Sequence, residues 1–352
     1  MLLSMVCWGS WANTQKADAR WRFELFYLDY NLGLLACAAL IGLTLGNLHP
    51  AGPDSFFANL HTAALRALLE AIAGGIVFTA GNLLLVAAIS IAGMSVAFPV
   101  GSGLGLVIGA VLNYLVAPSG NPLLIFSGIA LVCLAIALDA LAYRAHSAAT
   151  PVNMPSSRPE SLSEPRASRM GRSGEPPASG LRSTAAPSTT KGLILSIFGG
   201  IGAGLFYPLV AKSLTGLGAL NPYTVNFVFA VGAALSAIPI TYIFMRKPVA
   251  GPQLTLADYL AGRTPLHLWG IAGGLLWGVG TIANFVASAV PMIGPATSFS
   301  MGEGNTMISA LWGVFVWREF ANSTPGTRTL LTLMFLAFLL GLTSIALAPI
   351  IH

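Results

Sequence analysis

The chain has 352 residues, of which 55% are hydrophobic and only 8% are charged. A soluble domain carries about 25% charged residues, so this composition excludes a soluble protein. The apolar runs are continuous and about 20 residues long, the length of a membrane-spanning helix, whereas barrel strands would alternate over about ten residues. The net charge of +5 comes from residues between these runs, so it indicates membrane topology and not nucleic-acid binding.

The sequence predicts an all-α membrane protein with ten transmembrane helices. In chain order, the predicted spans are 1–15, 25–47, 66–91, 94–115, 122–143, 191–213, 222–245, 266–290, 294–317 and 328–349. The first span becomes polar at Asn13–Lys16 and is too short to cross about 30 Å of hydrocarbon. We expect either a helix that continues toward Arg20 or, as the favoured alternative, a true N-terminus upstream of Met1.

Residues 147–190 have a different composition from the rest of the chain. They contain seven prolines, ten serines and no aromatic residue. Such a segment buries too little apolar surface to offset its ordering entropy. We therefore predict a disordered linker at 147–190 between two five-helix units, 1–146 and 191–352.

The two units contain an internal repeat. Residues 71–85, AIAGGIVFTAGNLLL, align with 270–284, GIAGGLLWGVGTIAN, at an offset of 199. At the same offset Ala97 aligns with Ala296, and Gly105 aligns with Gly304. Packing chemistry alone, which repeats small residues at helix contacts, is the alternative, but a fixed offset over some forty residues disfavours it. A repeated helix pair predicts a transporter built from two related halves.

The basic residues predict how the chain lies in the membrane. Of the 17 Lys and Arg residues, all but Arg66 and Lys212 fall in alternate connections between the predicted helices. The positive-inside rule makes that side cytoplasmic. Both termini then lie outside, and the linker lies in the cytoplasm of a multi-pass plasma (inner) membrane protein. Because five helices per half is an odd number, the second half enters inverted, as in alternating-access carriers.

Enzyme and metal-site signatures are absent from the sequence. Cys7, Cys37 and Cys133 all lie inside apolar runs without metal-ligand spacing. There is no HExxH, GxSxG or GxxxxGK[ST] motif. We therefore expect no enzymatic activity, no cofactor, no metal and no nucleic-acid partner. The predicted partners are a small polar solute, the lipid bilayer and, as a coupling candidate, protons.

Glu303 is the strongest candidate for the site. It lies nine residues into the span that starts at Gly294, which is about 13 Å deep and close to the midplane. An ionised side chain there costs at least about 2.5–3.5 kcal/mol, so we expect Glu303 to face a cavity as a solute-binding and proton-coupling group. The alternative is a neutral acid bonded to a neighbouring helix. The repeat places Leu104 at the related position.

Other polar and aromatic residues in the apolar runs complete the candidate site. A flat polar solute is well held by a stacking ring together with amide donors and acceptors. The remaining candidates are Asn305, Trp277, Asn284, Asn82, Ser102, Trp11, Asp29 and Tyr30. For the Asn residues the alternative is a link between helices, and for the Trp residues an interface anchor. For Asp29 a gate or a salt bridge is an equal alternative.

Four motifs occur in order along the chain: Tyr27-Leu-Asp-Tyr30, Gly81-Asn82, Asn221-Pro-Tyr223-Thr and ISALWGVFVWRE at 308–319. They resemble the ureide permease family, which belongs to the drug/metabolite transporter superfamily. Ala296-Thr-Ser-Phe-Ser300 and Trp8-Gly9-Ser10 are also similar to the related glucose/ribose porters. Together the motifs cover nearly the whole chain outside the linker.

This resemblance implies a secondary transporter that takes up a ureide such as allantoin, or a nucleobase such as uracil, with protons. A monosaccharide transporter and a metabolite exporter are the alternatives. Two departures matter. Both families tend to carry Gln where this chain has Glu303, which adds a titratable group and leaves the substrate open. The linker has only Gly171-Arg-Ser173 in place of a phosphate-loop-like motif, so nucleotide binding is not expected. Oligomeric state is not predicted.

Overall fold

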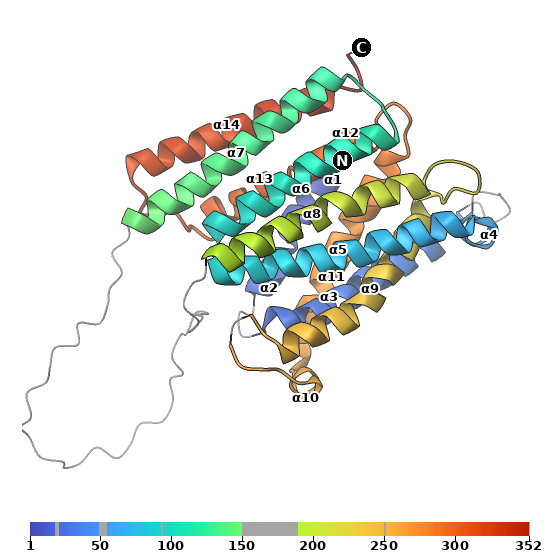
Figure 1. Ribbon diagram of the computed structural model, residues 1–352, viewed down its shortest axis with the longest axis horizontal. Coiled ribbons are helices and arrows are strands. Elements are labelled where there is room, and N and C mark those ends of the chain that lie inside the picture. The colour runs from blue at the N-terminus through green and yellow to red at the C-terminus, as the bar shows by residue number, and fades with distance from the viewer. Residues whose placement is uncertain (18–20, 49–54, 93, 150–188, 250, 352) are drawn as a thin grey trace, which may run out of the picture.

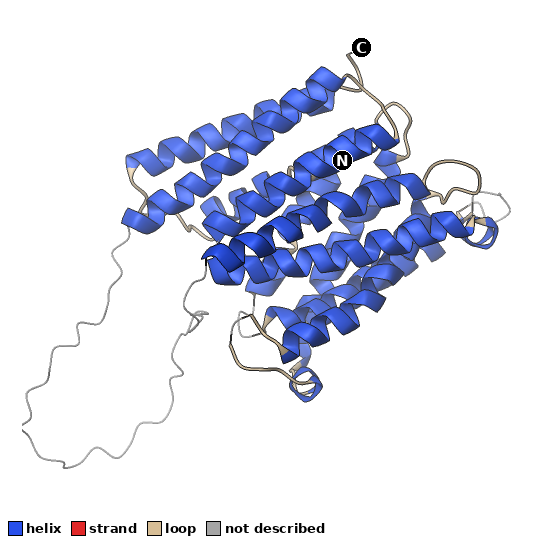
Figure 2. Ribbon diagram, viewed as in Figure 1, coloured by secondary structure: helices blue, strands red, loops and turns tan. Residues whose placement is uncertain are grey.

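The structure is a computed structural model that describes residues 1–17, 21–48, 55–92, 94–149, 189–249 and 251–351. Within these ranges all regular structure is helical (Figure 2). The predicted linker falls almost wholly at 150–188, outside the described residues. The helices are α1 (Leu2–Ser10), α2 (Ala12–Lys16), α3 (Phe23–Leu43), η1 (Leu45–Asn47), α4 (Phe56–Thr62), α5 (Leu65–Ala92), α6 (Met94–Val116), α7 (Pro122–Ala149), α8 (Thr189–Ser213), α9 (Pro222–Arg246), α10 (Leu256–Leu260), α11 (Thr264–Ser288), α12 (Gly294–Gly302), α13 (Asn305–Leu311), η2 (Trp312–Val316) and α14 (Pro325–Leu347).

Eight of the described helices are long and apolar enough to cross a membrane. They are α3, α5, α6, α7, α8, α9, α11 and α14, and each coincides with a predicted span. The two other predicted spans are divided. The first consists of α1 and α2, which meet at Trp11, and the ninth consists of α12, α13 and η2. The helical class is thus confirmed, and the count of ten spans stays a prediction.

Side-chain caps define where several long helices begin. Asn221 accepts hydrogen bonds from the backbone N–H groups of Tyr223 and Thr224, and Pro222 is the first residue of α9. Thr324 caps α14 in the same way ahead of Pro325. A proline in the first turn lacks only an N–H that would have no helical partner, so the cap and the proline together fix the start.

Helices of one half pack against helices of the other half (Figure 1). The repeat relates α1–α2 to α8, α3 to α9, α5 to α11, α6 to α12–α13 and α7 to α14. In the structure α5 packs against α8 and α9, while α11 packs against α1 and α3. Helices α7 and α14 pack against each other at one edge of the bundle. Each half therefore completes its core with helices of the other half.

Single residues also make contacts between the halves in repeat-related pairs. A Cβ on Gly75 would overlap the Phe229 carbonyl oxygen, and a Cβ on Gly274 would overlap the Tyr30 carbonyl oxygen. Gly274 lies 199 residues after Gly75, and Phe229 lies 199 residues after Tyr30, so the repeat offset relates the two contacts. Gly33 against Ile271 and Gly232 against Ile72 form a second such pair. Reciprocal contacts of this kind define a two-fold relation between the halves, and glycine permits the close backbone approach.

Candidate functional site

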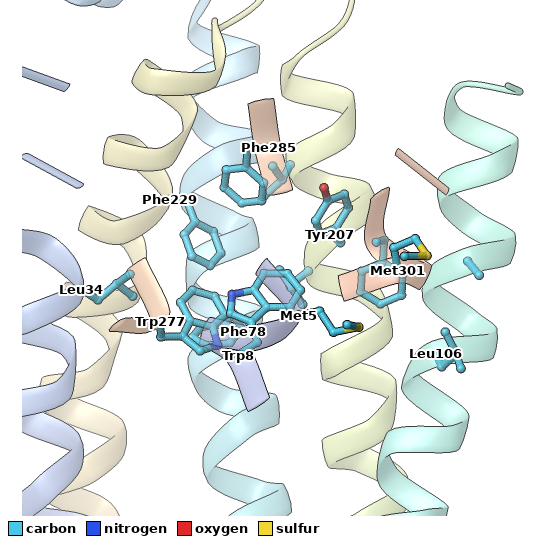
Figure 3. Close-up of a cluster of buried hydrophobic side chains, with 14 of the residues drawn as sticks. Met5, Trp8, Leu34, Phe78, Leu106, Tyr207, Phe229, Trp277, Phe285 and Met301 are labelled. Atoms are coloured by element: carbon cyan, nitrogen blue, oxygen red, sulfur yellow. The ribbon is translucent and has the colours of Figure 1, made fainter. Parts of the chain in front are cut away.

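Aromatic side chains fill the centre of the bundle, where the two halves meet. Phe78 of α5 and Trp277 of α11 occupy the same repeat position, and their ring centroids lie 4.4 Å apart. Trp8 stacks on Trp277 at 5.4 Å, and Phe229 lies 6.1 Å from it. Figure 3 shows these four rings gathered around Trp277. We call these four residues, with Tyr30 and Trp11, the aromatic centre.

Three sequence-predicted site residues come together in the aromatic centre. The Tyr30 ring lies 5.0 Å from Trp11 and 6.4 Å from Trp277. Trp277 and Tyr30 are buried, whereas Trp11 is half-buried at the junction of α1 and α2. The arrangement places rings from three helical segments near one point, and the prediction of Trp277 or Trp11 as a stacking surface stays a prediction.

Asn284 lies beside this centre, and its amide is occupied by protein groups. Its Nδ2 donates to the Ser298 carbonyl oxygen at 2.9 Å. Its Oδ1 accepts hydrogen bonds from the hydroxyls of Tyr207 and Ser298. These bonds join α8, α11 and α12, so the contacts match the alternative of a link between helices. Tyr207 is labelled in Figure 3, next to Phe285.

Asn82 belongs to a polar group on α3 and α5. Its Nδ2 donates to the Tyr27 hydroxyl at 3.0 Å, and the Tyr27 and Tyr30 rings stack at 5.2 Å. Asn31, one turn after Tyr27, lies on the same stretch of α3 and is buried. Tyr27 and Asn31 are polar residues of the same apolar run as Tyr30 but were not included in the predicted site. Their spacing of four residues, which places both on one helical face, is the signal that could have added them.

Glu303 and Asn305 flank the break between α12 and α13. Gly304 donates to the Met301 carbonyl oxygen at 3.1 Å, a bond of the tighter i to i+3 type, so the α-helical ladder stops at this point. Both Glu303 and Asn305 are partly accessible, although Gly302, Gly304 and Thr306 around them are buried. Among the described residues, no hydrogen bond or ion pair engages the Glu303 carboxyl group.

Ser102 is buried on α6, apart from the aromatic centre. A groove of about 610 Å³ opens between α6, α7 and α8. Its lining is apolar and includes Leu104, the repeat counterpart of Glu303, together with Val107, Cys133 and Ile136. No residue of the aromatic centre lines this groove, and the lining side chains suit an apolar occupant better than a polar solute.

Asp29 lies in a separate buried cluster near α10. It accepts hydrogen bonds from Trp21 Nε1 at 3.2 Å and from the Tyr259 hydroxyl at 2.5 Å. His267 Nδ1 lies 2.9 Å from the same carboxylate. Burial, and then the hydrogen bond to Asp29, raise the pKa of Tyr259. These contacts tie α3 to α10 and α11, and the gate and salt-bridge alternatives for Asp29 both stay predictions.

A second polar link ties α1 and α2 to the segment after α12. Hydrogen bonds run in register from Ser309 to the Gly9 carbonyl, from Trp312 to Ser10 and from Trp317 to Asn13. The series ends at the Lys16–Glu319 ion pair of 2.7 Å, where the Tyr143 hydroxyl also donates to Glu319 at 2.6 Å. The motif at 308–319 therefore holds the first segment in place.

Within the described residues, no group of three or more His, Cys, Asp or Glu side chains could hold a metal ion. Eight candidate membrane helices around a buried aromatic and polar centre define a multi-pass helical membrane protein, the class that includes solute permeases.

The chain belongs to the ureide permease family, whose profile matches residues 26–170 and 183–348. The members of this family are transporters and not enzymes. Ureide permease 1 of Arabidopsis thaliana is 27% identical over 97% of this chain and 94% of its own length. Probable ureide permease A3 of Vigna unguiculata is 25% identical over 93% of this chain and 96% of its own length. Transmembrane protein 144 homolog B of Dictyostelium discoideum is 31% identical over 44% of this chain and 39% of its own length.

Proposed function

We propose that this chain is a secondary active transporter that moves a ureide or nucleobase across the membrane by alternating access. The observation that carries the proposal is the aromatic centre, which is buried where the two halves meet and is bordered by Asn82 and by the Glu303 break. Family membership supports the same class of function. We place the chain within the drug/metabolite transporter superfamily on the motifs that it shares with that group.

The chemistry of the centre favours a flat, uncharged solute with amide-like edges. Trp277 and Phe78 are buried against each other and against Trp8, and we expect a planar heterocycle to stack on them once the two halves move apart. Asn82 and Tyr30 offer donors and acceptors that suit N–H and C=O groups. A monosaccharide remains the alternative substrate, but the names of the relatives favour a ureide.

The transport cycle follows from ten spans in two inverted five-helix repeats, 1–146 and 191–352. Rocking of one repeat against the other would expose a fixed central site to each side in turn. The links at Asp29–His267 and Lys16–Glu319 hold helices of different halves together, so they would break when their end of the bundle opens. The distribution of Lys and Arg makes this end cytoplasmic and both termini external.

Glu303 is proposed as the proton-coupling group. Its carboxyl group has no partner among the described residues and sits where α12 ends, so a proton and a solute could both reach it. Binding a proton would remove the cost of a charge at the midplane and allow the loaded carrier to reorient. Asn305, on the other side of the break, supplies a neighbouring amide.

The test is uptake into proteoliposomes that contain the purified chain, with radiolabelled allantoin, uracil, ribose and glucose and with or without an inward proton gradient. We expect saturable uptake of allantoin or uracil that increases with the gradient. Uptake of only ribose or glucose would favour the sugar alternative. Counterflow with preloaded vesicles measures outward movement and so tests the exporter alternative. No uptake of any of the four solutes would refute the proposal.

A further inference from the structure

We infer that the Tyr30 hydroxyl and the Asn31 amide oxygen, next to the Asn82–Tyr27 pair, form the polar edge that recognises the solute. This edge belongs to α3 and α5, and therefore to the first half alone. The inference rests on the proposed function and identifies the groups that form hydrogen bonds with the N–H and C=O groups of the substrate.

The starting observation is that two buried polar atoms lack partners. Tyr30 is 0% exposed and Asn31 is 2% exposed. Neither Tyr30 Oη nor Asn31 Oδ1 has a hydrogen-bond partner among the residues described. A buried polar atom without a partner loses its hydration without compensation, so each such atom requires an explanation, and a bound solute is one.

The repeat provides an internal comparison for the Tyr30 hydroxyl. Phe229 occupies the related position, and its carbonyl makes the same close contact with Gly75 that Tyr30 makes with Gly274. Phe229 also lies against Phe78 and Trp277, so a ring without a hydroxyl fulfils the packing role. The hydroxyl of Tyr30 is therefore not required for packing the two-fold centre.

Two neighbouring positions also carry different side chains in the two halves, with the amide in the first half. Asn31 corresponds to Ala230, and Asn82 corresponds to Thr281. The Thr281 hydroxyl is already engaged, since it accepts from Trp8 Nε1 at 3.2 Å and donates to the Trp277 carbonyl at 2.9 Å. At these two positions the second half therefore carries an apolar residue and an engaged hydroxyl. Asn226, the counterpart of Tyr27, differs from them, since both of its side-chain polar atoms are buried and without a partner among the described residues.

These groups are continuous with the stacking surface. Phe78 and Asn82 are four residues apart on α5 and lie on one helical face. Tyr27 and Tyr30 stack at 5.2 Å, and the side chains of Asn31 and Thr79 also approach the Tyr27 hydroxyl. Trp277 and Phe78 are buried against Trp8 and Phe229, so a planar solute would have to displace one of these rings to stack there, and its edge would then lie near Tyr30.

The chemistry of this edge selects the ligand class. Asn31 Oδ1 accepts from an N–H group, and Tyr30 Oη donates to a carbonyl. A ureido or imide group carries an N–H next to a C=O and can satisfy both at once. An analogue that is methylated at that nitrogen would leave Asn31 Oδ1 unpaired and should bind more weakly.

The test compares Tyr30→Phe and Asn31→Leu with Asn113→Leu in proteoliposomes. Asn113 is a matched control, because it is also buried and without a partner among the described residues but lies near the end of α6. We expect the KM for allantoin, or for uracil if that is the better substrate, to rise about tenfold in Tyr30→Phe and in Asn31→Leu, in line with the loss of one buried hydrogen bond. The KM of Asn113→Leu should stay within twofold of wild type.

Melting temperature without solute separates recognition from folding. Removing an unpartnered hydroxyl should leave the melting temperature of Tyr30→Phe unchanged or raised. A wild type that transports, with a KM in Tyr30→Phe that is also within twofold, overturns this inference and leaves the proposed function intact. A rise in KM that is accompanied by a lower melting temperature overturns it as well. A wild type that transports none of the solutes overturns both proposals.

Discussion

Phe78 and Trp277 occupy the same position in the two halves of the chain, 199 residues apart, and their rings meet with centroids 4.4 Å apart. Two residues related by a two-fold operation can touch only near its axis. Their contact therefore marks the axis, and the solute site proposed here is built around it. The site combines side chains that the symmetry repeats with side chains that only one half carries.

The first prediction concerns Glu303. Replacement of Glu303 by Gln keeps the size and hydrogen-bonding capacity of the side chain but removes the titratable proton. We expect Glu303→Gln to lose the stimulation of uptake by a proton gradient while solute exchange across the membrane continues. Uptake and counterflow in the same proteoliposomes measure both. Gradient stimulation equal to that of wild type would remove Glu303 from the coupling mechanism.

The second prediction concerns the buried Asp29 cluster. Asp29→Ala leaves His267, Tyr259 and Trp21 without their common acceptor. Removing one member of a buried pair typically costs about 3–5 kcal/mol, so we expect a clear fall in melting temperature in detergent. Asp29→Asn, which keeps one acceptor oxygen, should fall less. Equal melting temperatures for wild type and Asp29→Ala would show that the cluster adds no stability.

The third prediction uses the Lys16–Glu319 pair. Burial alone would raise the pKa of Glu319, but the hydrogen bonds from Lys16 and Tyr143 lower it below its ordinary value of 4.5. A lowered folded-state pKa contributes stability that is present above pH 4.5 and is lost as the pH falls through the folded value. The partly exposed pair is screened by solvent, so the contribution is under about 1 kcal/mol.

A pH series checks this sign. The melting temperature of Lys16→Met should lie slightly below that of wild type at pH 7 and should converge with it toward pH 3. High salt should reduce the difference at pH 7. A gap that widens as the pH falls would contradict the assignment of the pair.

The fourth prediction separates two kinds of glycine. A methyl group on Gly274 would overlap backbone atoms of Tyr30 and Leu34, whereas a methyl group on Gly103 would meet nothing within 4 Å. Gly274→Ala should therefore destabilise by about 1–3 kcal/mol through overpacking. Gly103→Ala should be neutral, or stabilising by up to about 1 kcal/mol through helix propensity. Similar melting temperatures for the two variants would be inconsistent with the close approach of α3 and α11.

The helices could be predicted from the sequence because lipid leaves the backbone few alternatives. Continuous apolar runs predicted eight spans, and the Asn221–Pro222 pair marked where α9 begins. The predicted ends differ most at α7, which continues from 143 to Ala149, and α14 begins at Pro325 and not at 328. The repeat at an offset of 199 also predicted two related halves, and glycines at repeat-related positions make reciprocal close contacts between them. These features depend on local composition or on strict periodicity, which a single sequence records.

The roles of the polar residues could not be predicted in the same way. Asn284 and Asn82 are alike in sequence, but Asn284 is fully engaged with Tyr207 and Ser298, whereas Asn82 pairs with Tyr27. Asp29 lies one residue before Tyr30, yet its side chain turns to His267 while the Tyr30 ring enters the aromatic centre. Which neighbour forms the hydrogen bond with a polar side chain depends on how the helices are rotated and packed. The sequence of a single helix does not determine either of these.

The most direct measurement of the central claim is the KM for allantoin or uracil in Trp277→Leu compared with Trp269→Leu. Both residues lie on α11, but Trp277 stacks in the aromatic centre and Trp269 is 44% exposed. Base-to-ring stacking is worth about 1–3 kcal/mol, so the KM of Trp277→Leu should rise about tenfold or more, while Trp269→Leu stays near wild type. Equal KM values in wild type and both variants would contradict a solute site at the aromatic centre.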